Sequence, residues 1–150
     1  MIAPPDWLPP GAIRLIELAL EEDLGRGDLT TDALIGADVR AHGSVVAREP
    51  VVVAGLQVAA EVFRRVDPGI DFVPLVTDGA QLGAGDTLLR VAGSARGLLR
   101  AERTALNFLQ RLSGIATRTR VFVTAAAAVP GTGTSVPTFV RAMSLASCSD

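Results

Sequence analysis

The sequence contains no lysine, and all 14 of its basic side chains are arginine. Without a lysine amine the chain cannot form a Schiff base or carry a lysine-attached cofactor, which excludes those two classes of chemistry. Arginine grips carboxylate and phosphate through two parallel hydrogen bonds, so a role in anion recognition stays open. A genome composition that replaces lysine with arginine everywhere is the commoner cause of such a count, so the count alone does not establish a role in anion recognition.

Cysteine and histidine are nearly as scarce, with one of each, Cys148 and His42. This excludes an internal disulfide framework and a Cys/His zinc cluster. No apolar run reaches the ~18 residues that cross a bilayer, and the N-terminus lacks the order of a signal peptide, so we expect a cytoplasmic protein. The formal net charge of −2 gives no basic field, so we expect neither a nucleic-acid nor a membrane partner.

The 150 residues contain enough apolar material for one folded core, since 49% of them are hydrophobic. The apolar period and the glycine and proline positions predict helices over 10–24 and 56–66. Runs of β-branched residues predict short strands, with a break at Pro50. The predicted strands lie within 43–55, 70–76 and 87–93. We therefore expect an α+β fold in which helices cover a small antiparallel sheet.

The segment DGAQLGAGD, between two predicted strands, contains Gly79, Gly83 and Gly85. These glycines resemble the hairpin of a biotinyl or lipoyl carrier, but such a carrier needs a lysine at the tip and the chain has none. They also resemble a phosphate-binding loop, which needs a lysine and a following helix, and no helix is predicted there. We therefore interpret them as structural turn glycines.

A long helical pattern spans residues 94–128. Its predicted buried stripe repeats at spacings of three and four. The stripe comprises Leu98, Ala101, Ala105, Phe108, Leu112 and Ile115. The opposite face presents a row of polar side chains without an acidic residue, which we call the cationic strip. The strip comprises Arg100, Arg103, Asn107 and Arg111. A solvated surface is the commoner explanation of such a strip, and an anion contact is the alternative. We expect Gly114 to bend or end this helix and TRTRVFVTAAAA to begin a second one.

Two blocks, GLLRAERTALNFLQRLSGIAT and EEDLGRGDLTTDALI, resemble segments of quinolinate phosphoribosyltransferase (nicotinate-nucleotide pyrophosphorylase, carboxylating) from the N-terminal part of that enzyme. The resemblance covers roughly residues 13–134. It implies an open-faced antiparallel sheet sandwich with helices, followed by the start of a truncated α/β barrel. It divides the chain into an N-terminal domain over 1–111, a first helical element leading to the barrel over 112–134, and a divergent tail over 135–150.

The resemblance also implies a reaction. The family transfers a phosphoribosyl group from phosphoribosyl pyrophosphate to quinolinate and removes a carboxylate, giving nicotinate mononucleotide, carbon dioxide and pyrophosphate on the route to NAD. The molybdenum-linked relative of the family shares the fold, so its different substrate is an alternative. Anionic substrates need fixed cations, and the family implies Mg²⁺, whose ligands are not in this chain. A homodimer or higher oligomer is implied for the complete protein.

One residue of the chain receives a role from the resemblance. In the family, the arginine of the ERT motif reaches into the barrel of the partner subunit and helps to hold the carboxylates of quinolinate. That residue is Arg103 here, so the resemblance implies that Arg103 binds substrate. Its place on the cationic strip agrees with this role. We assign no catalytic and no metal-binding residue.

The resemblance stops near Thr134. The residues that follow, SVPTFVRAMSLASCSD, lack the pattern of a barrel strand, which predicts either a shifted reading frame or a genuine short paralogue. Because a barrel supplies most of such an active site, we expect the chain alone to be inactive and its uncovered apolar surfaces to favour self-association. The alternative function is a non-enzymatic module that pairs with a full-length relative and lends it Arg103 or blocks it.

Overall fold

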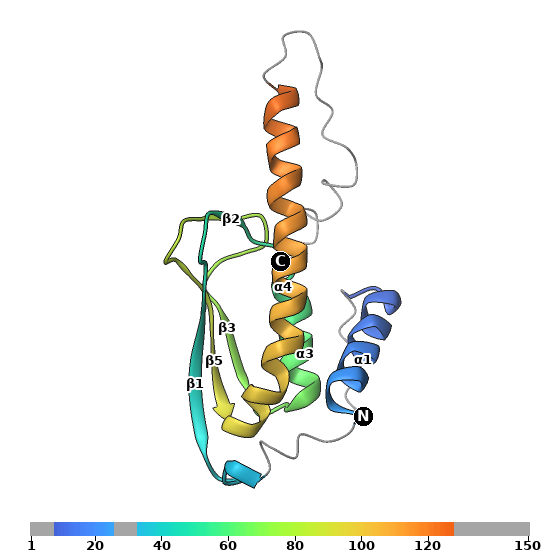
Figure 1. Ribbon diagram of the computed structural model, residues 1–150, viewed down its shortest axis with the longest axis vertical. Coiled ribbons are helices and arrows are strands. Elements are labelled where there is room, and N and C mark those ends of the chain that lie inside the picture. Colours follow the sequence, from blue (N-terminus) through green and yellow to red (C-terminus); the bar gives the residue numbers. More distant parts are fainter. Residues whose placement is uncertain (1–7, 26–32, 128–150) are drawn as a thin grey trace, which may run out of the picture.

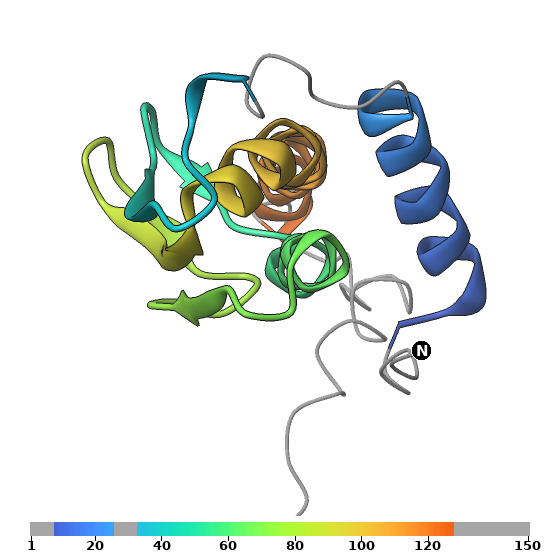
Figure 2. The ribbon, with the colours of Figure 1, turned by 90° about the horizontal axis from the view of Figure 1, so that it is seen from below.

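The computed structural model describes residues 8–25 and 33–127 (Figure 1). Two helices, α3 and α4, pack on one face of a small antiparallel sheet, and α1 packs on the far side of these helices, so the fold has three layers (Figure 2). Among the described residues, no element covers the other face of the sheet. This is the open-faced α+β sandwich predicted from the sequence. The tail predicted over 135–150 lies outside the described residues.

The main sheet is three-stranded and antiparallel, in the order β1, β5, β3. The strand bounds are Arg40–Val46 for β1, Asp71–Pro74 for β3 and Thr87–Ser94 for β5. Arg40 pairs with Ser94, and the register of β1 on β5 shifts between Val45 and Val46. The central strand β5 has a neighbour on each side and helices on one face, which buries Leu89 fully. Three of the predicted strands are therefore confirmed in this sheet.

A second, two-stranded ladder lies at the end of the sheet. Its strands are β2, Val51–Val52, and β4, Gln81–Leu82. Strand β2 follows the predicted break at Pro50, whereas β4 was not predicted from the sequence. Gly79 and Gly85 flank β4 with φ of 92° and 94°, a conformation that glycine adopts without steric cost. Both act as turn residues, which is the structural interpretation given above.

Helices α1, Pro10–Leu24, and α3, Leu56–Val66, have the predicted bounds. Proline at the first position of α1 suits a helix start, because the missing N–H has no partner there in any helix. Ile16, on the apolar face of α1, is fully buried. The core that α1 joins also includes Val62 of α3 and Val53, which follows β2.

The N-terminus of α3 is capped by a carboxylate from a distant loop. Gly55 precedes the helix with a φ of 95°, and it has no side chain to accept a hydrogen bond. Asp78 fills this role: its two carboxylate oxygens accept hydrogen bonds from the backbone N–H groups of Gly55 at 3.0 Å and Leu56 at 3.1 Å. A Cβ added to Gly55 would lie 2.5 Å from Cδ1 of Leu112 on α4. Glycine is therefore needed both for the turn and for the packing of the two helices.

Helix α4 spans Ala95–Ala127 without a break. Gly114 was predicted to bend or end the helix, and TRTRVFVTAAAA to begin a second one; the predicted end and the second helix are wrong. Residues on both sides of Gly114 tie the helix to the segment around β2: Ser113 Oγ accepts a hydrogen bond from the Ala54 N–H at 3.0 Å, and Thr117 Oγ1 accepts one from the Val52 N–H at 2.9 Å. These contacts offset the ~1 kcal/mol that glycine costs within a helix. No helix in the described ranges is long and apolar enough to cross a membrane.

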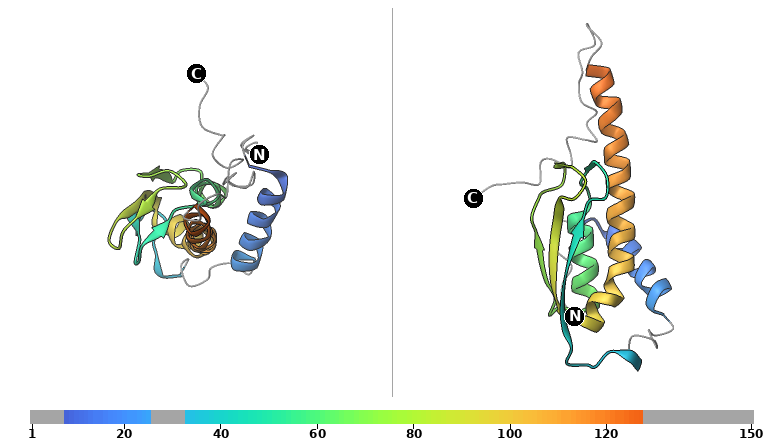
Figure 3. Two further views of the ribbon diagram at one scale, coloured as in Figure 1. Left: turned by 90° about the horizontal axis from the view of Figure 1, so that it is seen from above. Right: turned by 60° about the vertical axis from the view of Figure 1, so that its left-hand side comes forward.

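The predicted buried stripe of α4 holds only over its first half. Leu98, Ala101 and Ala105 are buried, whereas Ile115 is 58% exposed. The buried face moves to Leu109 and Ser113, and beyond them α4 extends past the sheet and past α3 (Figure 3). Among the described residues, the projecting part of α4 is packed less extensively than its first half. Large apolar side chains of this part therefore contact solvent.

Candidate substrate-contact site

Arg103 lies in the third turn of α4, on the side of the helix away from the sheet. Its side chain is 76% exposed. The other members of the cationic strip also reach the surface, with Asn107 and Arg111 exposed and Arg100 half-buried. The polar face predicted for α4 is therefore confirmed to lie at the surface of the domain. An exposed arginine in a fixed helix suits the recognition of an anion that approaches from outside the domain.

The cationic strip is not free of negative charge, which corrects the sequence analysis. Nη1 of Arg103 lies 3.4 Å from Oδ1 of Asp23, a residue of α1 that is 80 positions earlier in the chain. The other oxygen of Asp23 accepts a hydrogen bond from the Thr104 hydroxyl at 2.9 Å. The helical spacing within α4 reveals only neighbours on the same helix, so it gives no sign of this acidic residue on α1.

Helix α1 is held in place by a network of charged side chains on α3. Glu61, whose side chain is 1% exposed, accepts hydrogen bonds from Arg64 Nε at 2.7 Å and Arg65 Nε at 2.7 Å. Arg65 also donates from Nη1 to Glu17 of α1 at 2.9 Å. A buried carboxylate thus organises two arginines, and one of these joins α3 to α1. Asp23 lies on the same helix, less than two turns after Glu17.

Glu61 is a structural carboxylate and not a proton donor. Burial raises its pKa, but the hydrogen bonds and charges of Arg64 and Arg65 outweigh burial and hold the pKa below its ordinary value of 4.5. The hydrogen bonds that Arg64 donates to Glu61 in turn raise the pKa of Arg64. Glu61 and Arg64 are therefore both ionised at neutral pH. Their chemistry is that of a stable ion cluster.

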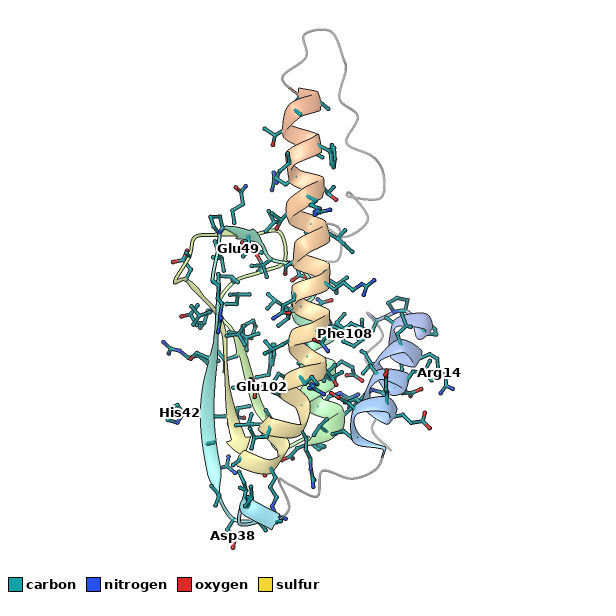
Figure 4. The ribbon with its side chains drawn as sticks, viewed as in Figure 1. Arg14, Asp38, His42, Glu49, Glu102 and Phe108 are labelled. Carbon is teal, nitrogen blue, oxygen red and sulfur yellow. The ribbon has the colours of Figure 1, made fainter. Side chains whose placement is uncertain are left out.

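A groove of about 1400 Å³ runs between β1 and α4, on another side of α4 from Arg103. Figure 4 shows Glu102 on the side of α4 toward the sheet, while Phe108 lies on the side toward α1. The groove is lined by apolar residues together with charges of both signs. The charged lining residues include Arg48, Glu49, Glu102 and Arg118. Because mixed charges do not concentrate a multiply charged anion, the groove is not the candidate site.

Comparison with known proteins identifies the family of this fold. The family described as "Quinolinate phosphoribosyl transferase, N-terminal domain" matches residues 28–113, which include β1 to β5, α3 and the first half of α4 with Arg103. The chain belongs to this family. The resemblance that the ERT block indicated is therefore confirmed.

Relatives of known name agree with this assignment. The "Nicotinate-nucleotide pyrophosphorylase [carboxylating]" of Mycobacterium leprae is 48% identical over 114 residues, which are 73% of this chain and 40% of that protein. The chloroplastic protein of the same name from rice, Oryza sativa subsp. japonica, is 42% identical over 126 residues, which are 83% of this chain and 34% of that protein.

Solved structures of the family share the fold. NadC from Streptococcus pyogenes matches with a TM-score of 0.77 and 39% identity, over 83% of this chain and 44% of that one. The nicotinate-nucleotide pyrophosphorylase from Francisella tularensis matches with a TM-score of 0.75 and 32% identity, over 81% of this chain and 44% of that one. The chain thus spans less than half the length of these relatives.

Proposed function

We propose that this chain is the N-terminal part of a quinolinate phosphoribosyltransferase and that Arg103 contacts a carboxylate of quinolinate. The reaction moves a phosphoribosyl group from phosphoribosyl pyrophosphate to quinolinate and releases carbon dioxide and pyrophosphate. The observation that carries the proposal is the position of Arg103: within the family-matched residues, on a helix anchored to the sheet, and 76% exposed. We also propose that the chain alone does not turn over substrate, because it covers less than half of the length of its relatives.

The chemistry explains why an arginine is useful at this position. In the transfer, the pyridine nitrogen of quinolinate forms a bond to C1 of the ribose while the bond from C1 to pyrophosphate breaks. The positive pyridinium then accepts the electron pair of the breaking C2–carboxylate bond, and a proton replaces the lost carbon dioxide. Arg103 takes no part in these bond changes. Its guanidinium orients the carboxylates, so the nitrogen faces the ribose.

The family also implies Mg²⁺ for the pyrophosphate, and the described residues do not fit such a site. Within 8–25 and 33–127, no group of three or more His, Cys, Asp or Glu side chains lies close enough to hold a metal ion. We place the Mg²⁺ ligands in the part of the enzyme that this chain does not contain. No step of the reaction is assigned here to the ion.

The exposed apolar residues on the projecting part of α4 support an assembly with further protein. Ile115, Val121 and Phe122 are all more than half exposed. We propose a homodimer or higher oligomer for the complete protein, and the non-enzymatic module that pairs with a full-length relative stays the alternative. We propose a cytoplasmic location for this chain. Its relatives include chloroplastic and mitochondrial proteins, so their locations do not decide that of this chain.

The proposal is tested by grafting residues 8–127 in place of the matching segment of NadC from Streptococcus pyogenes and measuring kcat/KM for quinolinate. Arg103→Ala should lower kcat/KM about 100-fold, the effect of losing two charge-assisted hydrogen bonds of ~1.5 kcal/mol each. Arg111→Ala is the matched control, since Arg111 is an exposed arginine on the same strip. It should change kcat/KM by less than about threefold.

Equal effects of the two substitutions would contradict the role of Arg103. A mixing experiment separates the alternative function: the intact 150-residue chain is added to full-length NadC in which the matching ERT arginine is alanine. Recovery of turnover, lost again with Arg103→Ala in the chain, would favour the pairing module. An inactive mixture beside an active graft would favour the enzyme part.

A further inference from the structure

The last turn of α1 carries negative charge where a helix least favours it. Glu21, Glu22 and Asp23 follow one another at its C-terminal end, and this turn contains no basic residue. The C-terminal end of a helix is the negative end of its dipole, so carboxylates there are destabilising. A sequence that breaks a local rule needs a compensating contact or a function. Of the three, Asp23 has contacts on α4, and these reach the proposed substrate arginine.

The contacts of Asp23 run from a buried anchor to an exposed cation. Thr104, 3% exposed, donates its hydroxyl to Oδ2 of Asp23 at 2.9 Å. The Asp23 side chain is itself 23% exposed, and its Oδ1 lies 3.4 Å from Nη1 of Arg103. The hydroxyl fixes one oxygen of the carboxylate, so the other oxygen has a defined place. That oxygen is a charged partner of the exposed guanidinium.

The geometry leaves most of the arginine available. Asp23 contacts Arg103 through Nη1 alone, at the long end of hydrogen-bond distance, and does not grip the guanidinium through two parallel bonds. A guanidinium has five N–H donors, so the other edge can still donate hydrogen bonds to a substrate carboxylate. A single contact of this kind restricts the rotamers of a long side chain without consuming its binding edge.

The helix that carries Asp23 is also fixed. Arg65, held by the buried Glu61, bridges to Glu17 of α1 at 2.9 Å, and Ile16 is fully buried against the same core. Asp23 follows these residues by less than two helical turns. The carboxylate is therefore presented by a docked helix and not by a loose segment.

We propose that Asp23 is a positioning residue for Arg103, with Thr104 as its anchor. The carboxylate holds the guanidinium in the orientation that meets quinolinate, so less conformational freedom is lost when the substrate binds. The proposal rests on the proposed function of Arg103. It goes beyond it by assigning a role to α1, whose residues lie outside the family-matched range.

The first test uses the intact chain and does not depend on catalysis. The side-chain Nε–Hε signals of ¹⁵N-labelled arginine are recorded by NMR for the wild type, for Asp23→Asn and for the control Glu22→Gln. Asp23→Asn should shift the Arg103 signal and lower its order parameter. Glu22→Gln should leave the Arg103 signal unchanged, and neither substitution should change the Arg111 signal. An unchanged Arg103 signal in Asp23→Asn overturns the proposal.

The second test uses the grafted enzyme and a double-mutant cycle. Asp23→Asn should raise KM for quinolinate about threefold, with kcat within about twofold, as expected for an exposed charge pair. In the Arg103→Ala background the same substitution should have no effect, because it acts only through Arg103. Thr104→Val should raise KM, and Thr104→Ser, which keeps the hydroxyl, should not.

The outcomes separate the two proposals. If Arg103→Ala leaves kcat/KM unchanged, the proposed function fails, and the NMR signal alone decides whether Asp23 fixes Arg103. If Arg103→Ala is severe but Asp23→Asn has no effect, or has the same effect with and without Arg103, the positioning role is overturned while the function of Arg103 stands.

Discussion

The cap of α3 gives a prediction whose size follows from the structure. Asp78 accepts hydrogen bonds from two N–H groups at the start of α3, at 3.0 Å and 3.1 Å, and brings a negative charge to the positive end of the helix dipole. Losing a helix cap costs about 1 kcal/mol, and losing the charge at the dipole costs up to about 1 kcal/mol more. Asp78→Ala should therefore lower the free energy of unfolding by about 2 kcal/mol. Asp78→Asn keeps one acceptor oxygen and should lose about half as much.

The assay is urea and thermal unfolding followed by circular dichroism at pH 7. A loss of 2 kcal/mol corresponds to a fall in Tm of about 4–8 °C for a domain of this size, with an unchanged urea m-value. Asp71→Ala is the control, since Asp71 is an exposed carboxylate at the start of β3. It should stay within about 0.5 kcal/mol of wild type. If Asp78→Ala behaves like Asp71→Ala, the carboxylate does not cap α3 and the reasoning is refuted.

Four further outcomes follow from the packing and the charges. Folding lowers the pKa of Glu61, so the unfolded state binds more protons and the free energy of unfolding decreases as the pH falls below about 4.5. Glu61→Gln should lower the free energy of unfolding by about 1–3 kcal/mol at pH 7 and weaken its dependence on pH in the acid range. Gly93→Ala places a Cβ 2.8 Å from Ile70 and should cost about 1–3 kcal/mol in urea unfolding. Gly114→Ala meets no atom within 4 Å and should stabilise the chain by about 0.5–1 kcal/mol, whereas a loss would mean that α4 bends there. Phe122 is 74% exposed and should promote self-association of the chain. Phe122→Ser should therefore reduce the apparent mass in light scattering. A monodisperse wild-type monomer would contradict this prediction.

The helices and strands could be predicted from the sequence because their signals are local. The bounds of α1 and α3 follow from apolar residues at helical spacing and from proline or glycine at the ends. Pro50 separates β1 from β2 because proline has no N–H to donate to a β-ladder, which is also a local signal. Strand β4 and the unbroken course of helix α4 were not predicted. In α4, Gly114 is tolerated through hydrogen bonds that Ser113 and Thr117 make to residues more than 50 positions earlier. Contacts of that kind leave no periodic signal in the sequence.

The candidate site was predicted only in part for the same reason. The ERT block indicated Arg103, and the period of the helix placed it on an exposed face, as the structure has it. The contact with Asp23 depends on how α1 docks, which no spacing within α4 reveals. One local signal was available: three consecutive carboxylates at the C-terminal end of a predicted helix oppose the dipole and point to a partner elsewhere.

The central claim is that Arg103 binds a carboxylate of quinolinate. It is tested most directly by a crystal structure of the grafted enzyme with quinolinate bound. We expect a guanidinium nitrogen of Arg103 at about 2.7–3.2 Å from a carboxylate oxygen of the ligand, with Asp23 still beside the arginine. A bound quinolinate whose carboxylates are held by other groups, with Arg103 more than about 6 Å away, would contradict it.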